Sequence, residues 1–172
     1  YKDGKIKEFI EKKYNKKNND ICDIDETSLL KSHRNNKPIC DFSSALYPYY
    51  TASEPCNCTN CRKKTPDHQG IFLVKPDQKE TYCKKYNPQI LVYQKAKYPE
   101  LNFGLSKGLS FDRVLIYPTK KIRDYLIKGD LKEIETIKAK FYVALTRARY
   151  SVGIILDYDD DAKYIKGLEK FK

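Results

Sequence analysis

The residues of this chain best suited to chemistry are a few basic side chains at the ends of expected elements. Arg147 stands at the end of an expected helix, and Arg34 precedes another. A guanidinium stays charged and grips phosphate oxygens with paired hydrogen bonds. Lys107 and Gly108 form a loop in which the lysine supplies a point charge and the glycine permits close approach of the backbone. These residue types predict a site for a phosphate-bearing ligand, whereas a solvated or ion-paired arginine and an ordinary basic turn are the plainer interpretations.

A second candidate site lies in a polar, cysteine-containing loop over residues 50–69. Cys56, Cys58 and Cys61 are closely spaced, and His68 follows them. Three thiolates and one imidazole could close a tetrahedral zinc site and stabilise a loop that has few apolar residues. Free surface cysteines are the alternative, because the loop lacks the usual pair of separated Cys-x2-Cys motifs.

The elements expected to position these residues alternate between helices and short apolar strands. Apolar residues at helical spacing, or in short continuous runs, distinguish the two kinds of element. Helices are expected over 6–16, 38–46, 79–86, 120–128 and 133–147 and after 161, and strands over 27–32, 71–74, 90–93, 101–103, 114–117 and 152–156. This order predicts a three-layer α/β fold with a mostly parallel sheet. No linker or internal repeat divides residues 1–172, so we expect a single domain.

The composition suits a folded domain with a basic surface. The 172 residues are 40% hydrophobic, and their formal net charge is +11. That charge suits a nucleic-acid partner, although a biased genome composition produces the same excess of lysine. No apolar run approaches the length of a membrane span and no signal peptide is recognisable, so we expect a cytoplasmic protein without a membrane partner. Because the chain starts at Tyr1 and has no Met, we expect a piece of a longer protein.

Three segments, in order along the chain, resemble motifs of superfamily I DNA helicases of the UvrD/Rep type. Residues 140–150 contain Tyr-Val-Ala-Leu-Thr-Arg-Ala and match motif VI almost letter for letter. Residues 102–118 contain Ser-Lys-Gly-Leu-Ser-Phe and resemble motif V, and residues 29–46 resemble motif IV. The resemblance implies that the chain is the C-terminal RecA-like domain of an ATP-dependent DNA helicase.

The resemblance also implies roles for individual residues. Arg147 and Arg34 are expected to be catalytic, because in the family these arginines reach the γ-phosphate and stabilise its developing charge. The residues expected at the nucleotide are Lys107, Gly108, Ser110, Thr146 and His33, and those expected at DNA are Ser106 and Asn102. The sequence departs from the family at Ser110, where many members have Glu, and at Gly104, where many have a His that touches DNA.

Cofactor and partners follow from the same resemblance. ATP with Mg²⁺ is expected between this domain and an N-terminal RecA-like domain of the same chain, which would hold the Mg²⁺. The DNA partner is expected to be a single strand or a single-strand/duplex junction. The sequence has no Gly-x4-Gly-Lys-Ser/Thr phosphate loop, so this chain alone is not expected to hydrolyse ATP. Two other classes stay open: a non-catalytic nucleic-acid-binding module and a zinc-stapled protein-interaction domain.

Overall fold

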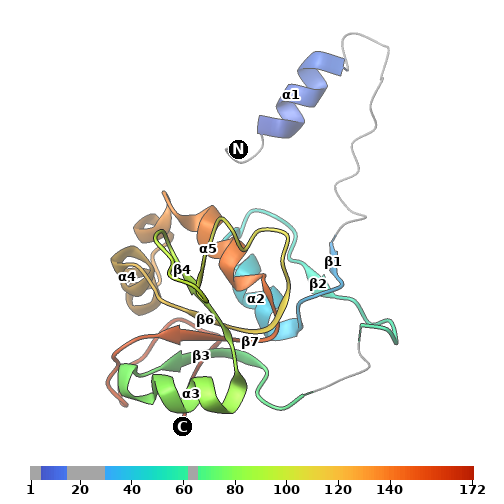
Figure 1. Cartoon of the computed structure of the whole chain (residues 1–172). Helices are drawn as coiled ribbons and strands as arrows, with labels where there is room; N and C mark the ends of the chain where they lie inside the picture. Colours follow the sequence, from blue (N-terminus) through green and yellow to red (C-terminus); the bar gives the residue numbers. More distant parts are fainter. Residues whose placement is uncertain (1–4, 15–29, 62–65) are drawn as a thin grey trace.

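The computed structural model describes residues 5–14, 30–61 and 66–172, and within them helices flank a parallel sheet (Figure 1). The helices are α1 (Lys5–Tyr14), α2 (Lys37–Ser44), α3 (Lys79–Tyr86), α4 (Lys120–Lys128) and α5 (Lys138–Leu145), with 3-10 helices η1 (Pro76–Gln78) and η2 (Leu131–Ile134). The strands are β1 (Lys31–Ser32), β2 (Glu54–Pro55), β3 (Gly70–Val74), β4 (Gln89–Val92), β5 (Leu101–Asn102), β6 (Phe111–Ile116), β7 (Ala148–Ile155) and β8 (Leu168–Lys170). None of the described helices is long and apolar enough to cross a membrane.

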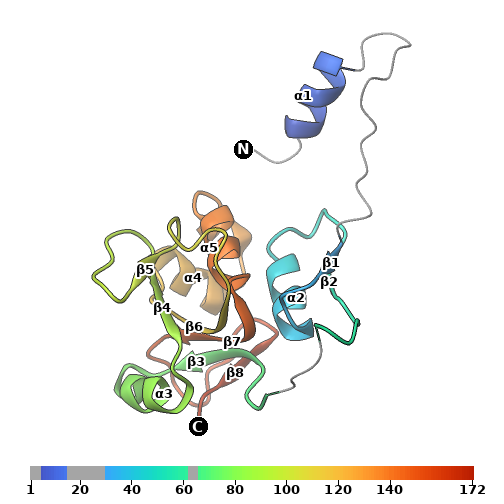
Figure 2. The ribbon, with the colours of Figure 1, turned by 45° about the vertical axis from the view of Figure 1, so that its right-hand side comes forward.

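Six strands form the main sheet in the order β5-β4-β6-β7-β3-β8. Every neighbouring pair is parallel. All five residues of β3 are buried, as expected for a strand covered on both faces. β1 and β2 form a separate parallel pair, which lies beside α2 (Figure 2).

Helices cover both faces of the main sheet (Figures 1 and 2). The larger core lies between the sheet and α2, α4 and α5, where Phe42, Leu126 and Phe141 pack against strand residues such as Val152. The smaller core lies under α3 and consists of Val74, Tyr82, Leu115 and Phe171. These layers confirm the predicted three-layer α/β class with a parallel sheet.

Helix α4 occupies the residues that its sequence signals predict. Thr119 caps the first turn, its hydroxyl accepting a hydrogen bond from the backbone N–H of Ile122 at 3.3 Å. Gly129 ends the helix in the left-handed conformation, with φ 74°. Both devices satisfy backbone groups that a helix end leaves without a partner.

The single helix predicted over 133–147 is wrong. The segment forms η2, then a break, then α5. At the break, the backbone N–H of Ile137 donates to the carbonyl of Ile134 at 2.8 Å, which is a tighter turn than the α-helix makes. Ile134 and Ile137 are both buried in the larger core, and this turn directs both side chains inward.

The helix predicted after residue 161 is also wrong. The chain instead forms β8, which pairs with β3 at the edge of the main sheet. Gly167 precedes this strand with φ 92°, a conformation that favours glycine and interrupts a helix. Phe171 then enters the smaller core, so burial of its ring favours the strand.

Candidate functional site

The two segments that resemble motifs V and VI meet at one edge of the sheet. Ser110 immediately precedes β6, and Arg147 immediately precedes β7. Because these strands are parallel neighbours, both begin at the same edge. The backbone N–H of Phe111 donates to the carbonyl of Arg147 at 2.9 Å, which joins the two segments directly.

Two asparagines dock the segment that resembles motif IV against the start of β7. The Asn35 amide donates to the carbonyls of Thr146 at 3.1 Å and Ala148 at 2.7 Å. The Asn36 amide donates to the carbonyl of Tyr150 at 2.7 Å, while its oxygen accepts from the first turn of α2. Both asparagines are buried. Sequence reasoning missed their docking role, although an asparagine ahead of a helical proline is a signal for a helix cap.

Arg34 and Arg147 lie beside one another around the end of α5. Arg34 Nη1 donates to the carbonyl of Thr146 at 3.0 Å. Arg147 Nε donates to the carbonyl of Val143 at 3.0 Å, and its Nη1 donates to that of Leu109 at 3.2 Å. Burial lowers the pKa of Arg147, and the positive charge of Arg34 lowers it further. Two guanidiniums from distant parts of the sequence therefore concentrate positive charge at one point.

The side chains of both arginines keep N–H donors for a ligand. A guanidinium has five N–H donors, and the contacts above engage only some of them. Within the described residues, neither Arg34 nor Arg147 forms an ion pair with a carboxylate. The negative end of α5 holds Arg147 in place through its carbonyls. This arrangement orients the guanidinium without neutralising it.

An open hollow of 430 Å³ adjoins Arg34, and we call it the anion hollow. It is lined by Ser32, His33, Arg34, Asn35, Ser110 and Arg149. Arg149 Nη1 lies 3.4 Å from Asp112 Oδ1, an exposed pair that contributes little stability. The guanidiniums of Arg34 and Arg149 and the hydroxyl of Ser110 are suited to phosphate oxygens, whereas the Asn35 amide already donates to two carbonyls. The contacts of Ser110 and His33 with a nucleotide stay predictions. Sequence reasoning missed Arg149, although it stands two residues after Arg147.

The loop between β5 and β6 presents a lysine and holds its own polar groups inside. Lys107 and Gly108 are exposed, and Gly108 has φ 88°, which favours glycine. Ser106 is fully buried, and its hydroxyl donates to the carbonyl of Phe103 at 2.9 Å. The Asn102 side chain accepts from the backbone N–H of Leu105 at 2.7 Å. Ser106 and Asn102 therefore shape this loop, and their predicted contact with DNA stays a prediction.

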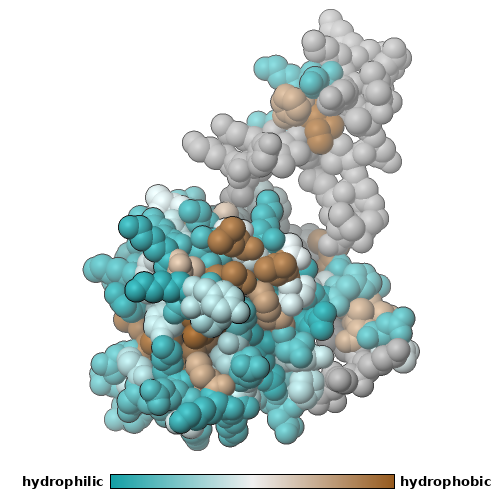
Figure 3. All heavy atoms as spheres, viewed as in Figure 1, coloured by the Kyte–Doolittle hydropathy of each residue, from teal (hydrophilic) through white to brown (hydrophobic). Residues whose placement is uncertain are grey.

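Figure 3 shows hydrophilic side chains over most of one face, interrupted by a patch of apolar ones. Leu105 and Leu109, which flank Lys107 and Gly108, are 66% and 44% exposed.

Thr146 is buried, and its hydroxyl donates back to the carbonyl of Tyr142 at 2.9 Å, so it fixes the end of α5.

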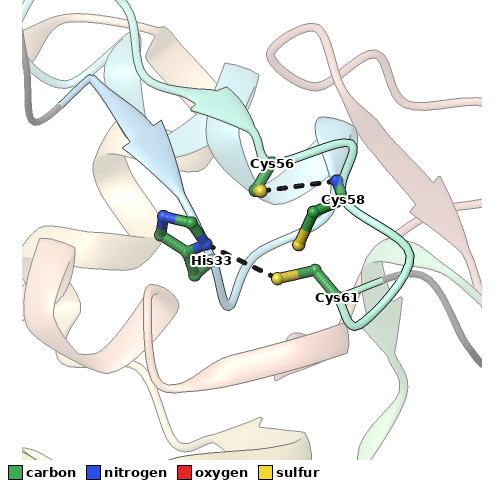
Figure 4. Close-up of side chains that lie close together, drawn as sticks. All are labelled: His33, Cys56, Cys58 and Cys61. Carbon is green, nitrogen blue, oxygen red and sulfur yellow. Dashed lines mark hydrogen bonds between the residues drawn. The ribbon is translucent and has the colours of Figure 1, made fainter.

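A candidate metal centre lies next to the anion hollow. Cys56, Cys58, Cys61 and His33 turn their side chains toward one another (Figure 4). One ligand atom of each lies within 4.8 Å of the other three. Cys61 Sγ lies 3.5 Å from His33 Nδ1, and Cys56 Sγ accepts from the backbone N–H of Cys58 at 3.5 Å. The set is a Cys3His group, the donor chemistry of structural zinc sites.

Pairing of β1 with β2 brings His33 to the cysteines. Ser32 is paired with Pro55, so His33 and Cys56 both follow the same end of a parallel pair. The backbone N–H of Cys56 donates to the carbonyl of Ser32 at 2.8 Å. The short strands thus join a distant histidine to the cysteine loop.

The prediction that His68 is the fourth ligand is wrong, because His33 occupies that position. The His68 ring stacks between Phe72 and Tyr86, with ring centroids 3.7 Å and 3.9 Å away. Its Nε2 lies 3.1 Å from the hydroxyl of Tyr82. The side chain belongs to an aromatic cluster at α3, not to the metal centre.

The thiols of the metal centre differ in acidity. Hydrogen bonding with Cys61 lowers the pKa of Cys58 to about 6, and the same contact raises the pKa of Cys61 to about 11. A thiol must lose its proton to ligate a metal. The hydrogen bond between the two thiols therefore favours the thiolate form of Cys58.

The aromatic cluster makes the stability of the chain sensitive to pH through His68. Burial, then the charges of Arg113 and Lys85, lower the pKa of His68 from 6.5 to about 4. The unfolded chain takes up this proton as pH falls below 6.5, whereas the folded chain does not until about pH 4. We expect the His68 contribution to stability to be complete above pH 6.5 and to be lost as pH falls from there toward 4.

Urea unfolding midpoints at pH 7, 6, 5 and 4 measure this effect. We expect His68→Phe, which keeps the stacking, to lose less stability than the unaltered chain over that range. Carboxylates add their own pH dependence to both proteins, so the difference between the two curves isolates the histidine. Parallel curves would contradict the assignment.

Comparisons with known proteins return structures but no sequence family. No protein-family model and no curated protein matches the chain. The arterivirus nonstructural protein 10 helicase aligns with 76% of this chain and 25% of its own, at 18% identity and TM-score 0.45. A structure of that helicase with DNA aligns at 18% identity and TM-score 0.45, over 74% of this chain and 25% of its own.

A bacterial structure also aligns with the chain. It is the C-terminal domain of a candidate DNA helicase from Lactobacillus plantarum, with 12% identity and TM-score 0.40 over 72% of this chain and 86% of that domain. Of the arterivirus helicase, by contrast, the chain spans only about a quarter of the length. Similarities at this level do not establish a family, so functional assignment depends on the chain's own residues.

Proposed function

We propose that this chain is the second RecA-like half of a superfamily I DNA helicase and completes an ATP site at its interface with a first half. The observation that carries the proposal is that both arginines are held at the end of α5, Arg34 by the carbonyl of Thr146 and Arg147 by the carbonyl of Val143. These arginines come from the segments that resemble motifs IV and VI. Ser110, from the segment that resembles motif V, lines the adjoining anion hollow.

In this proposal the two arginines act on the γ-phosphate of ATP. Their charges attract the phosphate oxygens, and their planar donors fix its orientation. Charge that develops on those oxygens during hydrolysis is stabilised by donors already held in position by backbone carbonyls. Ser110 adds a neutral hydrogen bond where many relatives have a carboxylate, so coupling through this position is weaker than in those relatives.

The proposed function assigns the remaining parts of the ATP site to the first RecA-like half. A phosphate loop and the ligands of Mg²⁺ would come from an N-terminal RecA-like domain, and closure of the two halves around ATP would move single-stranded DNA. Exposed Leu105 and Leu109 beside Lys107 support a docking surface at this edge. The net charge of +11 supports contact with single-stranded DNA or a junction, and the proposed location is cytoplasmic.

The test is ATP hydrolysis, stimulated by single-stranded DNA, by the intact protein that contains this chain. We expect Arg147→Ala to lower the rate by ~10²-fold or more while ATP binding is retained, because the lost interaction is made in the transition state. Arg123→Ala removes the same charge from an exposed position on α4 and is the matched control. An active protein indifferent to Arg147→Ala would refute the site, and an intact protein without ATPase activity would refute the motor.

A second candidate function is a zinc-stapled protein-interaction domain, which the Cys3His group favours. Such a domain would bind stoichiometric metal and a protein partner, with no affinity for DNA. Binding of single-stranded DNA by the intact protein distinguishes it from the motor and from a non-catalytic nucleic-acid-binding module. Such binding weakens as salt rises, because the DNA releases condensed counterions on association.

A further inference from the structure

We propose that His33, Cys56, Cys58 and Cys61 bind one Zn²⁺ and that this ion fixes the wall of the anion hollow that carries Arg34. The metal assignment is independent of the proposed function, whereas the consequence for Arg34 rests on it. The ion would act as a structural cross-link between the motif IV segment and the cysteine loop.

The four ligand atoms lie within 4.8 Å of one another, and the Cys61–His33 pair has the spacing of a tetrahedral zinc site. Bonds of ~2.3 Å to sulfur and ~2.0–2.1 Å to nitrogen place those two atoms roughly 3.5 Å apart in a tetrahedral site. Cys61 Sγ and His33 Nδ1 are 3.5 Å apart. The backbone N–H of Cys58 donates to Cys56 Sγ, a contact that stabilises a negatively charged sulfur.

The strand pair beside the metal group is short. β1 and β2 contain two residues each, and a two-stranded pair of this size is marginal in water. Cys58 and most residues of the loop are exposed, while Cys56 is buried. A metal that joins residues on both sides of this pair therefore provides the connection that apolar packing does not.

His33 connects the metal to the anion hollow, because it belongs to both. It lines the hollow, and it offers Nδ1 to the thiol of Cys61. Arg34 follows it in the chain, and Asn35 holds the segment from the other side through Thr146 and Ala148. Arg34 is thus fixed between a docked asparagine and a ligating histidine. Loss of the ion would free one of these two anchors.

Metal analysis tests the site without reference to activity. We expect one zinc per chain after purification without added metal, and thiolate-to-cobalt absorption after exchange with Co²⁺. Cys58→Ser and His33→Ala are expected to lower metal content, whereas Cys83→Ser, which alters a cysteine outside the group, is not. His33→Cys offers a fourth thiolate and is expected to restore binding.

Substoichiometric zinc in the unaltered chain would overturn the metal assignment. Metal content and cobalt absorption unchanged in His33→Ala would overturn the role of His33. If Cys58→Ser fails to fold, His33→Ala and His33→Cys still provide the comparison, because they differ only in the presence of a fourth ligand.

ATP hydrolysis by the intact protein tests the connection to Arg34. We expect Cys58→Ser to lower kcat roughly tenfold or more, since groups that support a site in this way typically contribute ~10–100-fold. Combined with Arg34→Ala, it should add little, because both changes remove the same positioned guanidinium. Full ATPase activity in a metal-free Cys58→Ser protein would overturn the connection. An intact protein that binds zinc but never hydrolyses ATP would refute the proposed function and leave the metal centre standing.

Discussion

Removing both arginines of the proposed site should cost little more activity than removing one. We expect Arg34→Ala and Arg147→Ala each to lower single-strand-stimulated ATP hydrolysis by ~10²-fold or more, and the double variant to lie within about threefold of the slower single variant. Residues that stabilise one transition state as a unit are strongly non-additive. Under the proposed function Arg34 and Arg147 would act as such a unit, since Arg34 binds the carbonyl of Thr146 and Arg147 contacts the Thr146 hydroxyl at 3.4 Å.

The measurement is kcat of the intact protein with saturating single-stranded DNA. Arg34→Ala combined with Arg123→Ala serves as the reference pair, because Arg123 lies exposed on α4 and should contribute nothing to the coupling. Rate losses that multiply, giving on the order of 10⁴-fold for the double variant, would mean that the arginines act independently and that the shared-site geometry is misassigned.

Gly153→Val is expected to destabilise the chain by about 3 kcal/mol or more. Gly153 is buried in β7, and an added Cβ would lie 2.8 Å from Leu115 Cδ1 and 3.0 Å from Tyr82 Cζ. Both neighbours are fully buried, and the Tyr82 hydroxyl is engaged with His68. At 2.8 Å and 3.0 Å something must shift, and both side chains are packed in the core, so the added atoms are expected to strain the contact between α3 and β7.

Chemical unfolding of the chain measures this effect through the denaturant midpoint. Gly153→Ala should lie between the two proteins. Ala45→Val adds volume at an exposed position of α2's C-cap and should change stability by no more than ~0.5 kcal/mol. A Gly153→Val chain as stable as its parent would show that α3 packs less closely on β7 than described.

The sequence predicted the fold wherever local signals and tertiary packing agree. Thr119 and Gly129 bound α4, and the apolar run of β3 has the continuous character of a strand covered on both faces. Predictions failed where packing decides. Ile134 and Ile137 suit a helix by spacing, yet both enter the core through a tight turn. Phe171 lies in a segment of helical composition, but its burial beneath α3 accompanies pairing of β8 with β3.

The sequence predicted some residues of the candidate site but not the contacts that join them. The spacing of Cys56, Cys58 and Cys61 indicates a metal group, but it does not identify the fourth ligand. His68 is the nearer histidine in sequence, whereas His33 reaches the sulfurs only because β1 pairs with β2. Likewise, nothing local indicates that Asn35 binds the carbonyls of Thr146 and Ala148. Such contacts depend on the order of strands in space.

That order also has a consequence for synthesis of the protein. The two neighbours of β3 in the sheet are β7 and β8. Gly70 therefore cannot pair until Ser151 has been synthesised, and Ile71 cannot pair with its β8 partner until Leu168 has been synthesised. At ~5–20 residues per second, the roughly 80–100 residues between these partners take about 4–20 seconds to synthesise. During that interval the apolar run Ile71–Val74 has no strand partner in the sheet. Nascent chains that end before β7 should therefore be bound by chaperones, and release should follow only once β8 has been made.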